Sequence, residues 1–326
     1  MVGRSMGRFI ARIAHLAVLF LLVLHLPVSQ AKIRSGGMAD YRVTFQWVHA
    51  PSGSRFLAVR RFVRGGASYF LLVNPQTFES SVARASALAL DGPAIFDDVR
   101  ETPFGHALLR YTAPPYHLRN YGAIHAMHSV DGMYLTVDLC PTAKPLDRTL
   151  FEQMLDEGTP SSTPLPVAVA ITGQWMERHP QDLTWLKEQL RDKHLAITWV
   201  NHSYDHPYTP NIPADYNFLL SPGVDFQAQV LRTEVALLER GLIPSPFFRF
   251  PGLVSNGEVV EQLRALSLIP IGSDAWLAKG QRARDGSFIL VHGNGNEPLG
   301  VSRFLRLRHR RPDVTLLPLP TAFSTP

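Results

Sequence analysis

Short β-like apolar runs alternate with amphipathic helical patterns from Gly132 to the end of the chain, and this alternation limits the possible folds more than any other feature. The β-like runs are MYLTVDL, PVAVAIT, LAITWV, FFRF, LIPIG, SFILV and VTLLP. Between them apolar residues recur at helical spacing, and Asn256 is a candidate N-cap of one such helix. Because strands joined by helices form parallel sheets, the pattern predicts an α/β fold. Seven runs favour a barrel-like β/α closure slightly short of eight strands, with a doubly wound open sheet as the alternative.

Residues 32–131 have a different pattern. The stretches YRVTFQWV, RFLAVRRFV and SYFLLV are β-rich and are separated by Gly and Pro, with no clear alternation of helices and strands. We therefore predict a β-rich accessory segment over 32–131 and an α/β domain over 132–326. The accessory segment carries no motif that indicates a function.

The first 31 residues resemble a secretory signal peptide, because basic residues, an apolar run and a small-residue site follow one another. Arg4, Arg8 and Arg12 precede the apolar run IAHLAVLFLLVLHLP, which ends in the small-residue site VSQA. An uncleaved membrane anchor is the alternative, but the run is shorter than the about 20 apolar residues that a spanning helix needs. We expect cleavage after Ala31 and an exported protein, periplasmic or extracellular, with no stable membrane span after cleavage.

Composition narrows the choice of partners. At 326 residues with 45% hydrophobic residues, the chain can fold into one large domain with an appendage. The formal net charge is +5, and part of the excess lies in RFLRLRHRRPD near the C-terminus. For an exported protein this charge favours attraction to anionic envelope polymers or membrane surfaces over nucleic acid, and a solvated helix face is the simpler alternative. Cys140 is the only cysteine, so no internal disulfide can form.

Polar side chains occur at the ends of six successive predicted strands. They are Asp138, Thr172 with Gly173, His202, Arg249, Asp274 and His292. In parallel β/α folds the C-terminal ends of the strands meet at one face, where active sites are built. The sequence therefore predicts that these groups converge at one rim.

Two histidines, His202 and His206, stand four residues apart in VNHSYDHPY, with Asp205 between them. Pro207 argues against a continuing helix and favours a strand-to-loop turn. In a tight turn both imidazoles can bind one metal ion, whereas two histidines in a polar loop are the alternative.

Hydrolysis at a metal site also needs a base, an acid and a group that holds the base. Asp138 is a candidate base, His292 a candidate acid and Arg249 a candidate clamp on Asp138. Each has a simpler alternative: a helix cap, a loop histidine and a structural ion pair. Their joint occurrence at one rim favours the catalytic interpretation.

Five short motifs follow one another in the order LTVDLCP, NHSYDHP, FFRFPG, SDAW and ILVHGN, with AVAITGQW after the first. They are similar to the motifs of the polysaccharide deacetylase family, whose first three are Thr-Phe-Asp-Asp-Gly-Pro, His-Ser/Thr-x-x-His and Arg-x-Pro-Tyr-Gly. From about Gly132 onward the chain resembles this family of carbohydrate esterases, which includes chitooligosaccharide, chitin and peptidoglycan N-deacetylases.

The resemblance implies a distorted seven-stranded β/α barrel, a divalent metal, usually zinc, and removal of N-acetyl groups from an amino-sugar polysaccharide. On this template His202 and His206 are metal ligands, Asp138 is the catalytic base, His292 is the general acid and Arg249 orients Asp138. We therefore expect an exported hydrolase that acts on a non-peptide C–N bond by metal-activated water.

Three further residues receive roles from the resemblance. Asp274 would support His292 or Arg249, and Trp276 would line the acyl pocket, with a core tryptophan as the alternative. Gly252 stands where the family has Tyr, and its backbone amide would serve as an oxyanion donor.

The chain departs from the family at Leu139, which stands where the third metal ligand, an Asp, is expected. An aliphatic side chain cannot coordinate a metal. Three outcomes remain open: Asp138 turns to the metal, Cys140 supplies a thiolate, or metal binding is weak or absent. The third outcome leads to two other functions, a non-catalytic glycan-binding or assembly protein and a metal-independent amidase or cyclic imide hydrolase.

Overall fold

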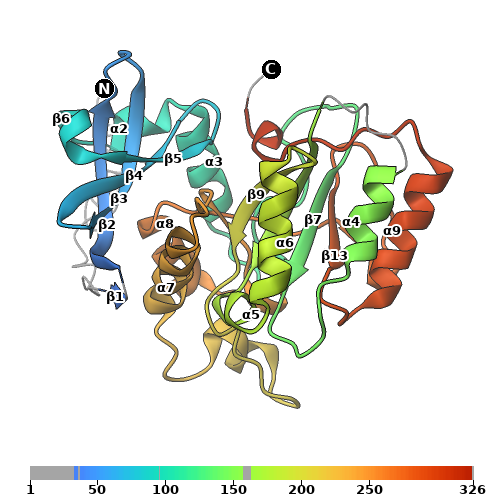
Figure 1. The fold of residues 1–326 in the computed structure, drawn as a ribbon. Coiled ribbons are helices and arrows are strands. Elements are labelled where there is room, and N and C mark those ends of the chain that lie inside the picture. The colour runs from blue at the N-terminus through green and yellow to red at the C-terminus, as the bar shows by residue number, and fades with distance from the viewer. Residues whose placement is uncertain (1–32, 36, 95, 157–162, 325–326) are drawn as a thin grey trace, which may run out of the picture. The chain divides into compact units, whose positions relative to one another are not determined.

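Seven parallel strands form one curled sheet in the second half of the chain (Figure 1). They are β7 (Tyr134–Leu139), β8 (Leu165–Ile171), β9 (Leu195–Asn201), β10 (Phe247–Phe248), β11 (Ile269–Pro270), β12 (Ala275–Trp276) and β13 (Phe288–His292). Their spatial order is β11–β10–β9–β8–β7–β13–β12. Because the last strand pairs with the first, the strands follow one another in barrel order, and the predicted seven-stranded β/α architecture is confirmed.

The computed structural model describes residues 33–35, 37–94, 96–156 and 163–324. The predicted signal peptide and its cleavage site lie outside these residues. Within them, no helix has both the length and the apolar character that crossing a membrane requires.

The two outer strands of the sheet, β11 and β12, do not pair with each other, and a segment from the N-terminal half lies against the ends of β11 and β13. Ala123 forms a parallel bridge with Ile271, and His125 forms an antiparallel bridge with Ser287. Residues that the sequence pattern assigned to the accessory segment thus bridge the end of β11 and the residue before β13. The predicted domain boundary at residue 131 stays a prediction.

One predicted strand is wrong. VTLLP, residues 314–318, forms only an isolated bridge in which Leu316 pairs with Met133. The reason is that β7 already pairs with β8 and β13. Only the N-terminal end of β7 is therefore accessible to another segment. The seventh strand is instead β12, which is too short to produce a periodic pattern.

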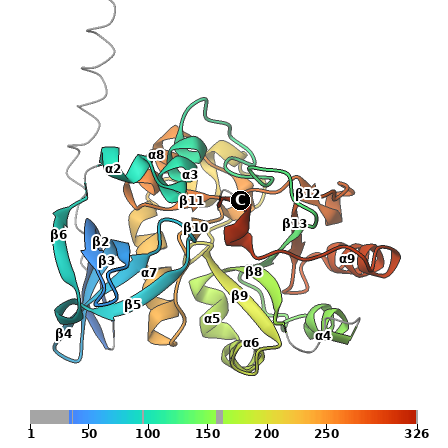
Figure 2. The same ribbon diagram turned by 90° about the horizontal axis from the view of Figure 1, so that it is seen from above.

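Helices connect the strands and cover the outer face of the sheet (Figure 2). They are α4 (Arg148–Asp156), α5 (Gly173–Arg178), α6 (Pro180–Arg191), α7 (Phe226–Glu239), α8 (Gly257–Ala265) and α9 (Pro298–Arg310). Asn256 caps α8 as predicted, because its side chain accepts a hydrogen bond from the amide of Val259. Alternate residues of β7, such as Val137 and Leu139, pack in the core that includes Leu150 of α4.

The N-terminal half contains the predicted β-rich structure as a separate antiparallel sheet. Its strands are β1 (Ile33–Ser35), β2 (Met38–His49), β3 (Arg55–Arg64), β4 (Ala67–Val73) and β5 (Ser80–Arg84), in that order, and β6 (Ala89–Pro93) pairs with β2. Two helices that the sequence pattern did not reveal follow, α2 (Phe96–Arg100) and α3 (Pro103–Thr112). Short 3₁₀ turns are η2 (Ala85–Ala87), η3 (Ala214–Tyr216), η4 (Phe218–Leu220), η5 (Pro251–Leu253), η6 (Leu277–Lys279) and η7 (Leu319–Ala322).

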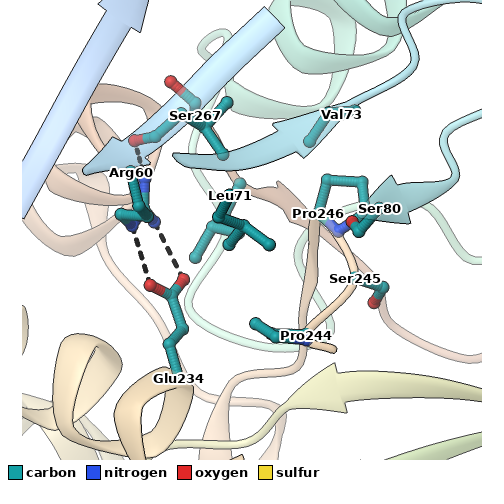
Figure 3. A pocket seen from close by; sticks show the side chains of 11 residues that line it. Arg60, Leu71, Val73, Ser80, Glu234, Pro244, Ser245, Pro246 and Ser267 are labelled. Atoms are coloured by element: carbon teal, nitrogen blue, oxygen red, sulfur yellow. Dashed lines mark hydrogen bonds and ion pairs between the residues drawn. The ribbon is translucent and has the colours of Figure 1, made fainter. Parts of the chain in front are cut away.

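A buried ion pair connects this sheet to α7. Arg60 of β3 donates from Nε and Nη2 to the two carboxylate oxygens of Glu234, at 2.7 and 2.8 Å (Figure 3). The hydroxyl of Tyr41 donates to Glu234 Oε2 at 2.8 Å. All three side chains are almost completely shielded from water. Because buried charges are tolerated only when paired and hydrogen-bonded, these contacts hold β3 against α7.

Candidate metal and catalytic centre

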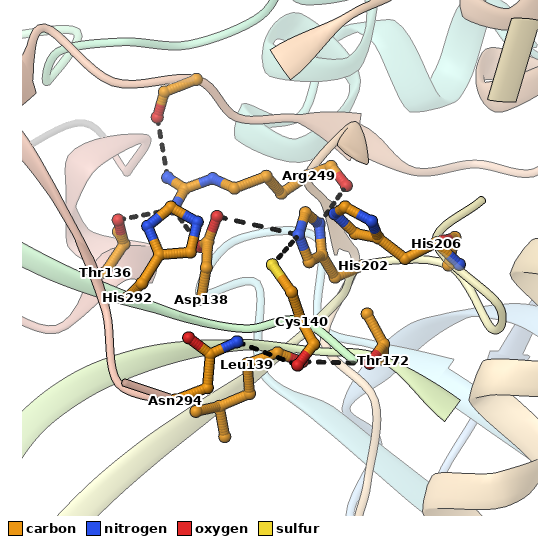
Figure 4. Close-up of polar contacts among 12 residues, drawn as sticks. Thr136, Asp138, Leu139, Cys140, Thr172, His202, His206, Arg249, His292 and Asn294 are labelled. Carbon is orange, nitrogen blue, oxygen red and sulfur yellow. Dashed lines mark hydrogen bonds and ion pairs between the residues drawn. The ribbon is translucent and has the colours of Figure 1, made fainter. Parts of the chain in front are cut away.

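Asp138, near the end of β7, forms a buried ion pair with Arg249, which directly follows β10 (Figure 4). Arg249 Nη1 donates to Asp138 Oδ1 and to Thr136 Oγ1, both at 2.7 Å, and Nη2 donates to the carbonyl oxygen of Gly272 at 2.8 Å. Both ionic side chains are buried. Hydrogen bonds from both Nη1 and Nη2 therefore hold the guanidinium in place, and the guanidinium in turn holds Asp138.

The Asp138 carboxyl is held in its ionised form. Burial by itself raises its pKa, but the opposing charge of Arg249, with smaller contributions from His202 and His292, outweighs burial and lowers the pKa below its usual value. Sequence reasoning missed Thr136. The sequence contained the information needed to find it, because Thr136 precedes Asp138 by two residues and so lies on the same face of the strand.

His202 and His206 lie in the turn that follows β9, with their ring centres 4.9 Å apart. Ser203 and His206 have φ angles of 66° and 46°, in the left-handed region that residues other than glycine seldom adopt. The side chain of Asn201 accepts a hydrogen bond from the amide of Ser203 at 3.0 Å. This sharp turn brings both imidazoles to the same side, as predicted.

Asp205, between the two histidines, holds the turn through contacts with α5 and α7. Its carboxylate accepts hydrogen bonds from Gln174 at 3.2 Å, from Gln229 at 2.6 Å and from Arg232 at 3.3 Å. The side-chain oxygen of Gln229 also accepts from the amides of Tyr204 and Asp205. Sequence reasoning did not identify Gln229, because its contacts depend on the packing of α7 against the turn.

Cys140, His202 and His206 form the group of three potential ligands that the described part of the chain brings together. Their ligand atoms all lie within 4.8 Å of one another, and Cys140 Sγ is 3.6 Å from His202 Nε2. His202 Nδ1 is 2.8 Å from the carbonyl oxygen of Arg249. Because a carbonyl can only accept, Nδ1 carries a proton, so Nε2, which faces Cys140, is the atom that would bind a metal. These residues therefore fit a divalent ion.

The surroundings of Cys140 favour its thiolate form. Burial raises the pKa of the thiol, but His206, followed by His202 and His292, outweighs burial and holds this pKa well below its usual value. The thiolate is the form of cysteine that binds metals.

Leu139 points away from this group. Its side chain is completely buried, and it packs in the core between the sheet and the outer helices. Figure 4 shows it on the opposite side of the strand from Asp138, as the alternation of side chains in a strand requires. Leu139 therefore supplies nothing to the centre.

His292, at the end of β13, is paired with a carboxylate that sequence reasoning missed. Glu297 Oε2 lies 2.8 Å from His292 Nδ1, off the direction of the N–H bond, so the contact is an ion pair and not an aligned hydrogen bond. Burial lowers the pKa of His292, but Cys140, Glu297 and Asp138 together raise it to about 10. The imidazole is therefore cationic at neutral pH.

Trp276 of β12 lies on the same side as His292, with the two ring centres 6.1 Å apart. Its Nε1 donates to Glu297 Oε2 at 2.8 Å, and the ammonium of Lys279 lies 3.3 Å from the centre of its ring. Its role in an acyl pocket stays a prediction.

Asp274 makes contacts other than those predicted for it. Its Oδ2 lies 2.8 Å from His125 Nδ1 and accepts from the hydroxyl of Ser287 at 3.2 Å, and its Oδ1 accepts from the amide of Phe288 at 3.1 Å. It thus joins the inserted N-terminal segment to β13. The carboxylate that contacts His292 is Glu297, because the turn before α9 places Glu297 beside the imidazole.

Gly252 lies in η5 with a φ of 61°. A Cβ atom there would lie 2.4 Å from the ring of Phe218, so a larger residue would force that ring to shift. Phe218 in turn packs edge-on against His206, with ring centres 5.8 Å apart. The backbone amide of Gly252 as an oxyanion donor stays a prediction.

Comparison with known proteins gives one family match and several structural ones. The family model described as RP012 protein N-terminal domain matches residues 39–98. A family 4 carbohydrate esterase from Bacillus anthracis is 13% identical over 61% of this chain and 85% of its own, with a TM-score of 0.45. One from Streptomyces lividans is 17% identical over 61% of this chain and 98% of its own, with a TM-score of 0.42. A family 4 pseudoenzyme from Bacillus anthracis is 13% identical over 59% of this chain and 65% of its own, with a TM-score of 0.41.

Proposed function

We propose that this protein is an exported, metal-dependent hydrolase that removes N-acetyl groups from an amino-sugar polysaccharide. The observation that carries the proposal is the convergence, at the C-terminal ends of successive strands, of a clamped carboxylate, an imidazole pair and an imidazole that contacts a carboxylate. These are Asp138 with Arg249, His202 with His206, and His292. Four of the five motifs that are similar to those of the polysaccharide deacetylase family contain these residues.

Each group has one task in this chemistry. His202 and His206 would hold a divalent ion, which would supply polarisation of the acetamide carbonyl and a more acidic water molecule. Asp138 is ionised, and its Oδ2, which is not bound to Arg249, lies 3.7 Å from His202 Nε2. It can accept the proton of the attacking water. His292 is cationic and donates a proton to the departing amine.

An exposed aromatic side chain beside the centre supports a sugar polymer as the substrate. Tyr208 is 61% exposed, and its ring stacks on Phe218 at 5.3 Å, which in turn contacts His206. Asn217 closes the loop that carries Tyr208 through hydrogen bonds to the backbone of Thr209, Ile212 and Phe218. A flat, fixed aromatic face is suited to the apolar face of a pyranose ring.

The direct test measures acetate release from N-acetylglucosamine oligomers with added zinc or cobalt. We expect activity in the wild type and its loss in Asp138→Ala and in the His202→Ala, His206→Ala double variant. If the wild type is no more active than the double variant across a broad glycan panel, the catalytic proposal fails for those substrates. Binding of glycans without hydrolysis would indicate a non-catalytic glycan-binding protein, and hydrolysis of small cyclic amides alone would indicate an imidase.

Export is tested separately. We expect the mature chain to begin at Lys32, and N-terminal sequencing of the protein from the periplasm or medium checks this. An intact Met1 in the membrane fraction would support the anchor instead.

A further inference from the structure

We propose that Cys140 is the third protein ligand of the metal, so that one thiolate and two imidazoles hold the ion. This deepens the proposed function and rests on it for the presence of a metal. In the family that the motifs resemble, the third ligand is an Asp at the position of Leu139. Here the ligand has moved one residue along the chain, and its chemistry changes from carboxylate to sulfur.

The two residues before Cys140 are not available as the third metal ligand. Leu139 is completely buried in the core between the sheet and its helices, on the other side of the strand. Asp138 is bound to Arg249 at 2.7 Å. If Asp138 turned to the metal, the buried guanidinium would lose its counter-ion, which is strongly unfavourable. Cys140 lies directly after the strand, and its sulfur points toward His202 (Figure 4).

The distances agree with a zinc site. Zn–S bonds of about 2.3 Å and Zn–N bonds of about 2.0–2.1 Å give ligand-to-ligand distances of about 3.5 Å in a tetrahedron. Cys140 Sγ and His202 Nε2 are 3.6 Å apart, and all three ligand atoms lie within 4.8 Å of one another. A movement of about an ångström by one ligand therefore completes the three-ligand set. The fourth position stays open, as in catalytic zinc sites.

The backbone around Cys140 is fixed independently of any metal. Asn294 Nδ2 donates to the carbonyl oxygen of Cys140 at 2.9 Å, and Thr172 Oγ1 donates to that of Leu139 at 3.0 Å. Cys140 itself is only 7% exposed. The sulfur is therefore preorganised beside the imidazoles and needs no rearrangement of the strand.

A thiolate ligand has two chemical consequences. Sulfur favours zinc and similar metals over magnesium, calcium and manganese, which prefer oxygen ligands. A thiolate is also open to oxidation, which would remove it as a ligand, whereas a carboxylate is not. The centre is therefore expected to be selective for zinc or cobalt and sensitive to oxidants.

The test uses the mature chain freed of metal by a chelator and titrated with Co²⁺ or Zn²⁺ alone. With cobalt, we expect a sulfur-to-cobalt charge-transfer absorption in the near ultraviolet from the wild type and none from Cys140→Ser. Cys140→Ala should weaken zinc binding by more than the 10–100-fold that loss of an outer-shell partner costs. Asp138→Asn removes the other candidate ligand and should keep the charge-transfer absorption, and thermal unfolding shows whether it folds without the counter-ion of Arg249.

A second readout needs no substitution. Because Cys140 is the only cysteine, alkylation by iodoacetamide reports on this thiol alone, and saturating zinc should protect it. Thermal unfolding of the metal-free proteins shows whether Cys140→Ser and Cys140→Ala fold like the wild type. If neither variant folds, the protection experiment decides, and unprotected alkylation at saturating zinc overturns the proposal.

The metal titrations and the alkylation contain no substrate. Their outcomes therefore test the ligand assignment separately from the proposed function. Equal zinc affinity in the wild type and Cys140→Ser, with no charge-transfer absorption, overturns the ligand assignment even where acetate is released. Charge-transfer absorption with no hydrolysis of any glycan supports the assignment and contradicts the proposed function.

Discussion

One carboxylate oxygen, Oε2 of Glu297, lies 2.8 Å from His292 Nδ1 and accepts a hydrogen bond from Trp276 Nε1 at the same distance. His292 is the main reason that the pKa of Glu297 is lowered. Glu297 is the N-cap residue of α9, and the short loop after β13 brings it back over the end of that strand. The candidate general acid and the candidate wall of the acyl pocket are therefore held by the same anion.

Replacing Glu297 by Gln tests this positioning role. The amide keeps the size of the side chain and can still accept from Trp276, but the negative charge beside His292 is lost. We expect kcat for deacetylation to fall at least about tenfold, yet less than the 10²–10⁴-fold that loss of a general acid costs, with little change in KM. Steady-state kinetics on N-acetylglucosamine oligomers measure both parameters.

The controls for this prediction are His292→Gln and the double variant Glu297→Gln, His292→Gln. If Glu297 acts through His292, the double variant should be no worse than His292→Gln. Multiplicative losses would show that the two residues act independently.

Leu139→Asp, which restores the family's residue type, should damage the protein and leave its metal binding no tighter. The carboxyl would enter a closed apolar core where nothing pairs with it. We expect a loss in the free energy of unfolding of about 3–5 kcal/mol or more, above the about 2–5 kcal/mol of the matched cavity variant Leu139→Ala. Denaturant unfolding and zinc titration measure the two effects. Tighter zinc binding by Leu139→Asp would show that this side chain does reach the metal.

The convergence of Asp138, His202, Arg249 and His292 was predictable because it depends on strand alternation and parallel order. Both leave a signal in the local pattern of apolar residues. Once the strands are parallel, residues at their C-terminal ends meet at one rim wherever they lie in the sequence. That Leu139 cannot be a ligand follows from its aliphatic side chain alone.

The missed features depend on contacts between distant segments. His125 and Asp274 are 149 positions apart, and no local pattern connects them. β12 has two residues, which is too short for any periodicity, and VTLLP has a strand-like composition but no free strand to pair with. Glu297 belongs to no motif, and its role follows from how α9 begins. Such features are fixed by packing, which a single sequence does not display.

Tyr208→Ala should affect long substrates more than short ones. Its exposed ring is proposed to contact a sugar ring away from the reacting N-acetyl group. Loss of an aromatic contact worth about 0.5–1.5 kcal/mol corresponds to a roughly two- to tenfold higher KM for a hexamer, with kcat unchanged. Kinetics on N-acetylglucosamine oligomers of increasing length measure the effect.

The control for this prediction is Leu90→Ala in β6, because Leu90 is also 61% exposed but lies in the N-terminal sheet. It should leave KM unchanged for every length. An equal KM for Tyr208→Ala and the wild type with the hexamer would remove the loop from the substrate site.

Tyr41→Phe should reduce the loss of stability in alkali. Burial raises the pKa of the Tyr41 hydroxyl well above its ordinary value of 10.0, and the nearby Glu234 carboxylate raises it further. Above pH 10 the unfolded chain therefore releases this proton while the folded protein keeps it. Stability that is fully present below pH 10 is then lost by up to about 1.4 kcal/mol per pH unit as the pH rises toward the folded-state pKa.

The variant lacks this proton and should show a shallower decline between pH 10 and 11. It should also be less stable than the wild type by about 1–3 kcal/mol at neutral pH, because the hydrogen bond to Glu234 is lost. Urea unfolding at a series of pH values measures both effects, and Tyr216→Phe, at a position that is 61% exposed, controls for the removal of one phenol. Parallel curves for Tyr41→Phe and the wild type above pH 10 would show that the Tyr41 proton is not retained by the folded protein.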